Sequence, residues 1–138
     1  MIDPDEFLGK RFGKNGRYLV KRLIGHGGMG AVFEALDSKY DRPVAFKAFI
    51  RDGDHAEYRA RFIKEGKQFK GIEHPNVAEI YGLNDEQGHL SIVSEFIDGE
   101  NLLDYMKGWD QIDVDLVLDI AEQVADGLRA SHLSLIHI

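Results

Sequence analysis

Short runs rich in β-branched and aromatic residues recur within roughly the first hundred positions, which is typical of β-strands. Turn-forming segments at residues 38–43 and 84–89 separate some of these runs. Five strands are expected, at residues 18–24, 31–36, 44–50, 77–83 and 90–96. The sequence therefore predicts that a β-sheet dominates this part of the chain.

A helical periodicity interrupts the strands after residue 54. One face of the expected helix carries residues spaced by four, three and four positions: Tyr58, Phe62, Glu65 and Phe69. Asp54 and Glu57 have the spacing of a capping box at its start. Gly66 costs such a helix about 1 kcal/mol relative to alanine. A buried carboxylate needs a cation, and Lys47 on the preceding strand is the candidate partner of Glu65.

Helical patterns alone follow residue 97. A short helix is expected at residues 102–106, and Asp113 has the character of the N-cap of a longer one. The longer helix has an apolar stripe formed by Val117, Ile120, Ala121, Val124 and Leu128. Residues 1–16 are polar with scattered apolar positions and are expected to form an extended lead-in. The order of elements predicts an α+β protein.

Composition narrows the classes of function. A length of 138 residues suits about one domain. The net charge of −7 argues against nucleic acid as a partner. No cysteine is present, which fits a reducing cytoplasm. The first ten residues do not form a secretory signal, and no apolar run approaches the ~18 residues of a membrane span, which leaves open an anchor elsewhere in a longer protein. The six histidines show no metal-ligand spacing, so no metal site is expected.

A glycine-rich segment at residues 25–32, with the sequence GHGGMGAV, carries the candidate chemistry. Four glycines within six residues allow a backbone to approach a ligand closely, because no Cβ intervenes. A dinucleotide-binding fold requires the last glycine to open a helix, whereas a strand follows here. A P-loop requires Gly-Lys-Ser/Thr at its end, whereas Gly30 is followed by Ala31 and Val32.

The strand, glycine loop and strand, followed by VAFK at residues 44–47, resemble the N-terminal lobe of a eukaryotic-like Ser/Thr protein kinase. The sequence Gly-Gly-Met-Gly most resembles the glycine-rich loops of bacterial Ser/Thr kinases. HPN at residues 74–76 resembles the turn after the family's αC helix, and SIVSEFIDGENL resembles its fifth strand and hinge. The resemblance implies a kinase-like fold with a five-stranded antiparallel sheet, one αC-type helix and the first helices of an incomplete helical lobe.

The resemblance also implies the residues of an ATP site. Lys47 would hold the α- and β-phosphates, and Glu65 would pair with it. Val32 and Ala45 would sandwich adenine. Further along the chain, Ser94 would be the gatekeeper, the backbones of Glu95 and Ile97 would bond adenine, and Asn101 would lie near the ribose. The remaining residues belong to the glycine-rich loop: Ile24, Gly25, His26, Gly27, Gly28, Met29 and Gly30.

The resemblance covers residues 17–132. It divides the chain into a lead-in at 1–16, an ATP-binding lobe at 17–97, and the hinge exit with the first C-lobe helices at 98–132. The family's His-Arg-Asp loop, and the Asn and Asp-Phe-Gly that hold Mg²⁺, do not occur in this sequence. Residues 133–138, LSLIHI, are one translation of a transposase adapter end used in sequencing libraries, and we expect them to be a non-native tail.

Three hypotheses follow. The first is the ATP-binding part of a kinase that phosphorylates protein Ser/Thr hydroxyls, with this fragment itself inactive. The second is a pseudokinase, a nucleotide-binding regulatory module. The third is a kinase-fold enzyme that phosphorylates small molecules. The glycine loop and the HPN turn favour a protein substrate by resemblance, and the missing catalytic motifs would separate the first two.

Overall fold

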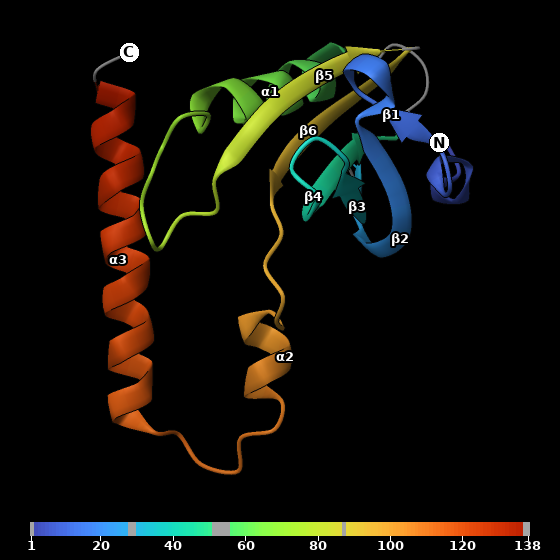
Figure 1. Ribbon diagram of the computed structural model, residues 1–138. Helices are drawn as coiled ribbons and strands as arrows, with labels where there is room; N and C mark the ends of the chain where they lie inside the picture. The colour runs from blue at the N-terminus through green and yellow to red at the C-terminus, as the bar shows by residue number, and fades with distance from the viewer. Residues whose placement is uncertain (1, 28–29, 51–55, 87, 137–138) are drawn as a thin grey trace.

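A computed structural model describes residues 2–27, 30–50, 56–86 and 88–136 of the chain (Figure 1). Within these residues six strands form one antiparallel sheet in the order β1-β2-β3-β4-β6-β5. The strands are β1 (Arg11–Phe12), β2 (Tyr18–His26), β3 (Gly30–Asp37), β4 (Arg42–Phe49), β5 (Ile80–Glu86) and β6 (His89–Glu95). The helices are η1 (Pro4–Phe7), η2 (Lys14–Gly16), α1 (Ala56–Gln68), α2 (Leu102–Met106) and α3 (Val114–Ile136).

The five strands expected from sequence are present, with shifted ends. β5 begins three residues later than expected, at Ile80, because its pairing with β6 starts there, and Val77 forms an isolated bridge with His74. The hairpin between β5 and β6 is shorter than expected, since the strands stay paired to Glu86 and His89. Gly88 has a φ of 76°, which suits the tight turn.

The sheet has one strand more than the sequence predicted, and the first sixteen residues are not an extended lead-in. η1 and β1 lie in this segment, and β1 pairs with the start of β2. Phe7 and Phe12 are buried and stack against each other with ring centroids 5.5 Å apart. Phe12 also lies 5.2 Å from the ring of Phe46 on β4. These contacts between distant residues cover a sheet face that would otherwise be exposed.

The two faces of the sheet are covered differently. Alternate residues of β3 and β4, such as Phe33 and Phe46, belong to the core under the N-terminal segment. α1 covers part of the opposite face, where Phe62 packs with Phe49, Leu90 and Ile92. Because α1 covers only one end of this face, Val32, Ala45 and Lys47 remain partly exposed beside it.

Gly66 explains how closely α1 approaches the sheet. A Cβ at this position would lie 3.0 Å from Cγ1 of Ile92 and 3.1 Å from Cδ1 of Leu83. The helical cost of glycine is therefore offset by packing. The capping box expected at Asp54 and Glu57 falls partly outside the described residues, and α1 is described from Ala56.

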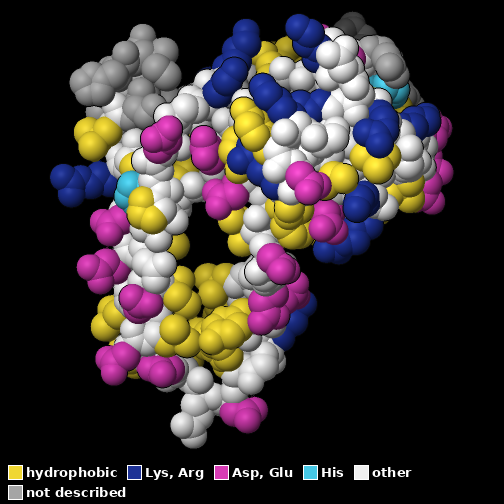
Figure 2. Space-filling model, viewed as in Figure 1, with side chains coloured by type: hydrophobic (Ala, Val, Ile, Leu, Met, Phe, Trp, Pro, Cys, Tyr) yellow, Lys and Arg dark blue, Asp and Glu magenta, His cyan; other side chains and the backbone are white. Residues whose placement is uncertain are grey.

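The helices after the sheet agree with the sequence. α2 spans the expected residues, and the carboxylate of Asp113 accepts bonds from the backbone N–H groups of Asp115 and Leu116 at the start of α3. Apolar side chains of α2 and α3 face the space between the two helices, and acidic ones line α3 (Figure 2). None of the helices in the described part of the chain is long and apolar enough to cross a membrane.

The turn at residues 74–76 joins the sheet layer to α3. The side-chain amide of Asn76 donates to Oε1 of Gln123 at 3.2 Å. Gly127 permits this approach, because a Cβ there would lie 2.7 Å from the carbonyl oxygen of Asn76. α3 is thus fixed against the segment that follows α1, as Figure 1 shows.

Candidate functional site

A cleft of ≈ 300 Å³ lies where β2, β3 and β4 meet the segment that leaves β6. Ile24, Val32 and Ala45 supply its apolar walls from three neighbouring strands. Residues 95–99 close the other side, and Ile97 is 63% exposed there. The cleft therefore combines an apolar slot with the polar backbone of a chain segment that has left the sheet.

Strand register places the apolar wall and the lysine on one surface. Val32 on β3 is opposite Lys47 on β4, and Ala45 lies two residues before Lys47. Side chains two residues apart on a strand share a face. The same alternation sends Phe46 to the core on the opposite face.

Lys47 and Glu65 form an ion pair at the end of this surface. Nζ of Lys47 lies 2.8 Å from Oε1 of Glu65, and the side chains are 29% and 39% exposed. The ammonium also lies 5.6 Å from the ring centroid of Phe62, one turn before Glu65 on α1. A half-exposed pair of this kind contributes only about 1 kcal/mol or less to stability. The ion pair matters for geometry, because it fixes the position of the Lys47 ammonium relative to the cleft.

The glycine-rich segment forms the hairpin between β2 and β3. The N–H of Gly27 donates to the carbonyl of Gly30 at 2.9 Å, while Gly28 and Met29 lie outside the described residues. Gly30 faces β4 so closely that a Cβ would lie 2.5 Å from the carbonyl oxygen of Ala48. A Cβ on Gly25 or Gly27 would meet nothing within 4 Å. His26, between them, is exposed and pairs with Ala31 across the hairpin.

The segment after β6 carries the remaining predicted residues. Ser94 lies opposite Ala45 in the sheet register. The N–H of Glu95 donates to the carbonyl of Glu79 at 2.8 Å. In return, the N–H of Glu79 donates to the carboxylate of Glu95 at 3.2 Å. Ile97 donates no backbone hydrogen bond within the described part of the chain.

Asn101 has a structural partner. It caps α2, accepting from the N–H of Asp104 at 2.9 Å, and its amide donates to the Asp104 carboxylate at 2.7 Å. The pKa of the Asp104 carboxyl is lowered, first by its hydrogen bond with Lys107 and then by that with Asn101. The side chain of Asn101, which the resemblance placed near a ribose, is thus used to cap α2.

Sequence reasoning missed four residues that line the cleft. Arg22 lines it and is paired with Glu34 across the β2–β3 hairpin. Phe96, Asp98 and Gly99 also line it. The alternation along β2 and β3 could have revealed Arg22 opposite Glu34, but only the tertiary structure shows that this pair borders the cleft.

The curled antiparallel sheet, with a helix carboxylate on a strand lysine beside the cleft, is the architecture of a protein kinase N-terminal lobe. Residues 18–137 match the family described as protein kinase domain, and the chain belongs to that family. The solved structure described as "PpkA-294 apo form" shares this fold, with a TM-score of 0.62, 21% identity, and coverage of 73% of this chain and 42% of that one.

Curated relatives agree with the family. The chain is similar to serine/threonine-protein kinase PrkC of Bacillus subtilis, with 34% identity over 91% of this chain and 19% of PrkC. PknA of Corynebacterium glutamicum is 35% identical over 87% of this chain and 27% of that protein. PknA of Mycobacterium tuberculosis is 33% identical over 89% and 30%. The chain thus spans less than a third of the length of these relatives.

Proposed function

We propose that this chain is the ATP-binding part of a Ser/Thr protein kinase, which transfers the γ-phosphate of ATP to protein hydroxyl groups. The observation that carries the proposal is the 2.8 Å pair of Lys47 and Glu65 at the end of the cleft. The names of the relatives, all Ser/Thr protein kinases, support the reaction and the protein substrate. ATP as a substrate also supports a cytoplasmic location.

Adenine would enter the apolar slot. Val32 and Ala45 would make apolar contact with the adenine ring, and Ile24 would extend this contact. The N–H of Ile97, which has no described partner, would donate to a ring nitrogen. The backbone of Glu95 would contribute through its carbonyl, because its N–H already binds Glu79. Asn101 would reach the ribose only if its side chain released the N–H of Asp104.

The phosphates would extend toward Lys47. Its ammonium would donate to phosphate oxygens while Glu65 holds it in place, so that two anions share one cation. The hairpin would cover the phosphates with backbone N–H groups. The open space at the Cβ positions of Gly25 and Gly27 supports this, because internal packing gives no reason for glycine at either position.

Mg²⁺ accompanies ATP in this family, and the described residues do not fit a site for it. They contain no group of three or more His, Asp or Glu side chains that could hold a metal ion. We therefore assign no residue of this chain to Mg²⁺. The chain also lacks the motif that supplies the proton acceptor, so we expect it to bind nucleotide weakly and transfer no phosphate.

An NMR titration of the ¹⁵N-labelled chain with a non-hydrolysable ATP analogue tests the site. We expect the amide signals of Val32, Ala45 and Ile97 to shift together. Ala45→Leu, which fills the slot, should weaken binding by about tenfold or more. Ala60→Leu on the exposed face of α1 is the matched control and should leave affinity unchanged. Equal affinity of the two variants, or shifts away from the cleft, would refute the proposal.

A further inference from the structure

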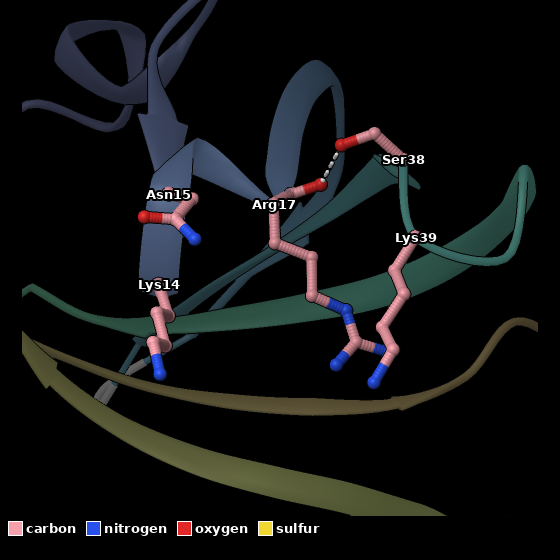
Figure 3. A pocket seen from close by; sticks show the side chains of 5 residues that line it. All are labelled: Lys14, Asn15, Arg17, Ser38 and Lys39. Carbon is pink, nitrogen blue, oxygen red and sulfur yellow. Dashed lines mark hydrogen bonds between the residues drawn. The ribbon is translucent and has the colours of Figure 1, made fainter.

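A second hollow, of ≈ 450 Å³, lies at the opposite end of the β2–β3 hairpin from the glycine-rich segment. Lys14, Asn15 and Arg17 line it from the chain that enters β2, and Ser38 and Lys39 line it from the turn after β3 (Figure 3). The ends of the Lys14, Arg17 and Lys39 side chains point the same way in this view. None of these residues borders the cleft of the proposed ATP site.

The charge of this hollow is positive. Its lining includes three cationic side chains and no carboxylate. Two carboxylates lie behind the lining: Glu86 accepts from the N–H of Gly13 at 2.9 Å, and Asp37, which is fully buried, accepts from Nε and Nη2 of Arg17 at 2.7 and 2.8 Å and lies 3.6 Å from Nε of Arg42. Neither Lys14 nor Lys39 has an ion pair with any residue of the described chain. After Arg17 is neutralised by Asp37, two ammonium groups remain without a counter-charge.

The hollow is also held in a defined shape. The Arg17 guanidinium lies 5.0 Å from the ring of Tyr18 and 5.1 Å from that of Tyr40. Ser38 donates its hydroxyl to the carbonyl of Arg17 at 2.5 Å, and the N–H of Lys39 donates to Asp37 at 3.0 Å. The hydrogen bond from Arg17 lowers the pKa of Asp37, so this support stays ionised. Both rims are therefore tied to one partly buried ion pair.

The charge distribution of the whole chain makes the hollow unusual. Residues 98–138 contain nine acidic and two basic residues, which accounts for the entire net charge of −7. Residues 1–97 are balanced, with fifteen of each sign. In a segment with equal numbers of acidic and basic residues, exposed lysine side chains normally lie apart from one another in water. Here two of them line one hollow together with an arginine.

We propose that this hollow binds the phosphoryl group of a phosphorylated serine or threonine in a peptide segment. A phosphate monoester carries close to two negative charges and three acceptor oxygens, which matches two unpaired ammonium groups and a fixed guanidinium. A single hollow on an acidic chain suits one phosphoryl group better than the repeated phosphates of a nucleic acid. The choice of phosphoserine or phosphothreonine rests on the proposed kinase function, because those are the products of such an enzyme.

The test is an NMR titration of the 138-residue chain with three probes. These are an acetyl-Gly-phosphothreonine-Gly amide, its unphosphorylated form and inorganic phosphate. We expect the amides of Lys14, Asn15 and Lys39 to shift with the phosphopeptide and not with the unphosphorylated peptide. The exposed pair Lys14→Ala/Lys39→Ala should weaken binding by about tenfold or more. Lys64→Ala/Lys67→Ala on α1 makes the same charge change and should alter affinity by less than about twofold.

Several results would overturn the proposal. Shifts of equal size with the unphosphorylated peptide would remove the phosphoryl group from recognition. Equal losses in the two double variants would show only a general charge effect. Binding of inorganic phosphate without the phosphopeptide would reject the peptide as ligand. Nucleotide binding is followed separately at Ala45 and Ile97, so failure of the proposed ATP site would leave the signals of the hollow unaffected.

Discussion

Alanine substitutions along the glycine-rich hairpin should separate glycines that serve the fold from those that serve a ligand. A Cβ at Gly30 would lie 2.5 Å from the backbone oxygen of Ala48, which is paired within the β3–β4 ladder. Ordinary Cβ contacts are nearly 1 Å longer, and backbone in a sheet does not move aside easily. We expect Gly30→Ala to lower the free energy of unfolding by about 1–3 kcal/mol, the usual cost of overpacking.

Gly25 and Gly27 provide the matched comparison. An added Cβ meets nothing within 4 Å at either position. We expect Gly25→Ala and Gly27→Ala to change the free energy of unfolding by less than about 0.5 kcal/mol. The same variants should weaken binding of an ATP analogue, because the added methyl group keeps the hairpin away from the phosphates.

Urea denaturation and calorimetric titration of the three variants measure the two effects. If Gly30→Ala is as stable as Gly25→Ala, the close approach to β4 does not limit the hairpin, and the reasoning fails. If Gly25→Ala and Gly27→Ala bind the analogue as well as the unchanged chain does, the hairpin does not cover a ligand. The stability result and the binding result can fail independently.

Three further predictions concern other parts of the molecule. Lys47→Met should weaken binding of an ATP analogue by about tenfold or more and should lower the free energy of unfolding by at most about 1 kcal/mol. The control Lys67→Met should change neither quantity. Equal affinities of the two variants for the analogue, measured by calorimetry, would contradict this prediction. The pKa of Asp37 is lowered from its ordinary 3.8, first by the hydrogen bond from Arg17, so its carboxylate stabilises the fold above that value and the stability is lost as pH falls toward the lowered pKa. Urea denaturation from about pH 5 to about pH 3 should show this loss, and Asp37→Asn should be less stable and should not show it. Gly127→Ala places a Cβ 2.7 Å from a backbone oxygen of the 74–76 turn, so hydrogen exchange should accelerate in that turn; unchanged exchange would argue against a tight contact with α3.

Local patterns in the sequence predicted most of the elements. The composition of strands, turn residues and the Asp113 cap act over a few neighbouring positions, so they can be recognised without a partner segment. The same is true of the alternation that puts Ala45 and Lys47 on one face of β4. The ends of β5 were wrong because pairing with β6 determines where the strand begins.

Contacts between distant residues were not visible in the sequence. The two residues of β1 are too few to show a period, and Phe7 and Phe12 became core residues only through rings on β3 and β4. The reason for Gly66 likewise lies in side chains of β5 and β6. The second hollow requires two turns that are more than twenty residues apart.

The sequence by itself determined the class of fold, the glycine-rich hairpin, and the choice of Lys47 and Glu65 as partners, because residue type and spacing encode these. The tertiary structure decided the 2.8 Å geometry of that pair, the walls of the cleft, and which glycines face protein and which face open space. It also assigned Phe7 and Phe12 of the N-terminal segment to the core. The physical reason is that close packing depends on what lies across from each residue, and that neighbour is set by the whole fold rather than by the local chain.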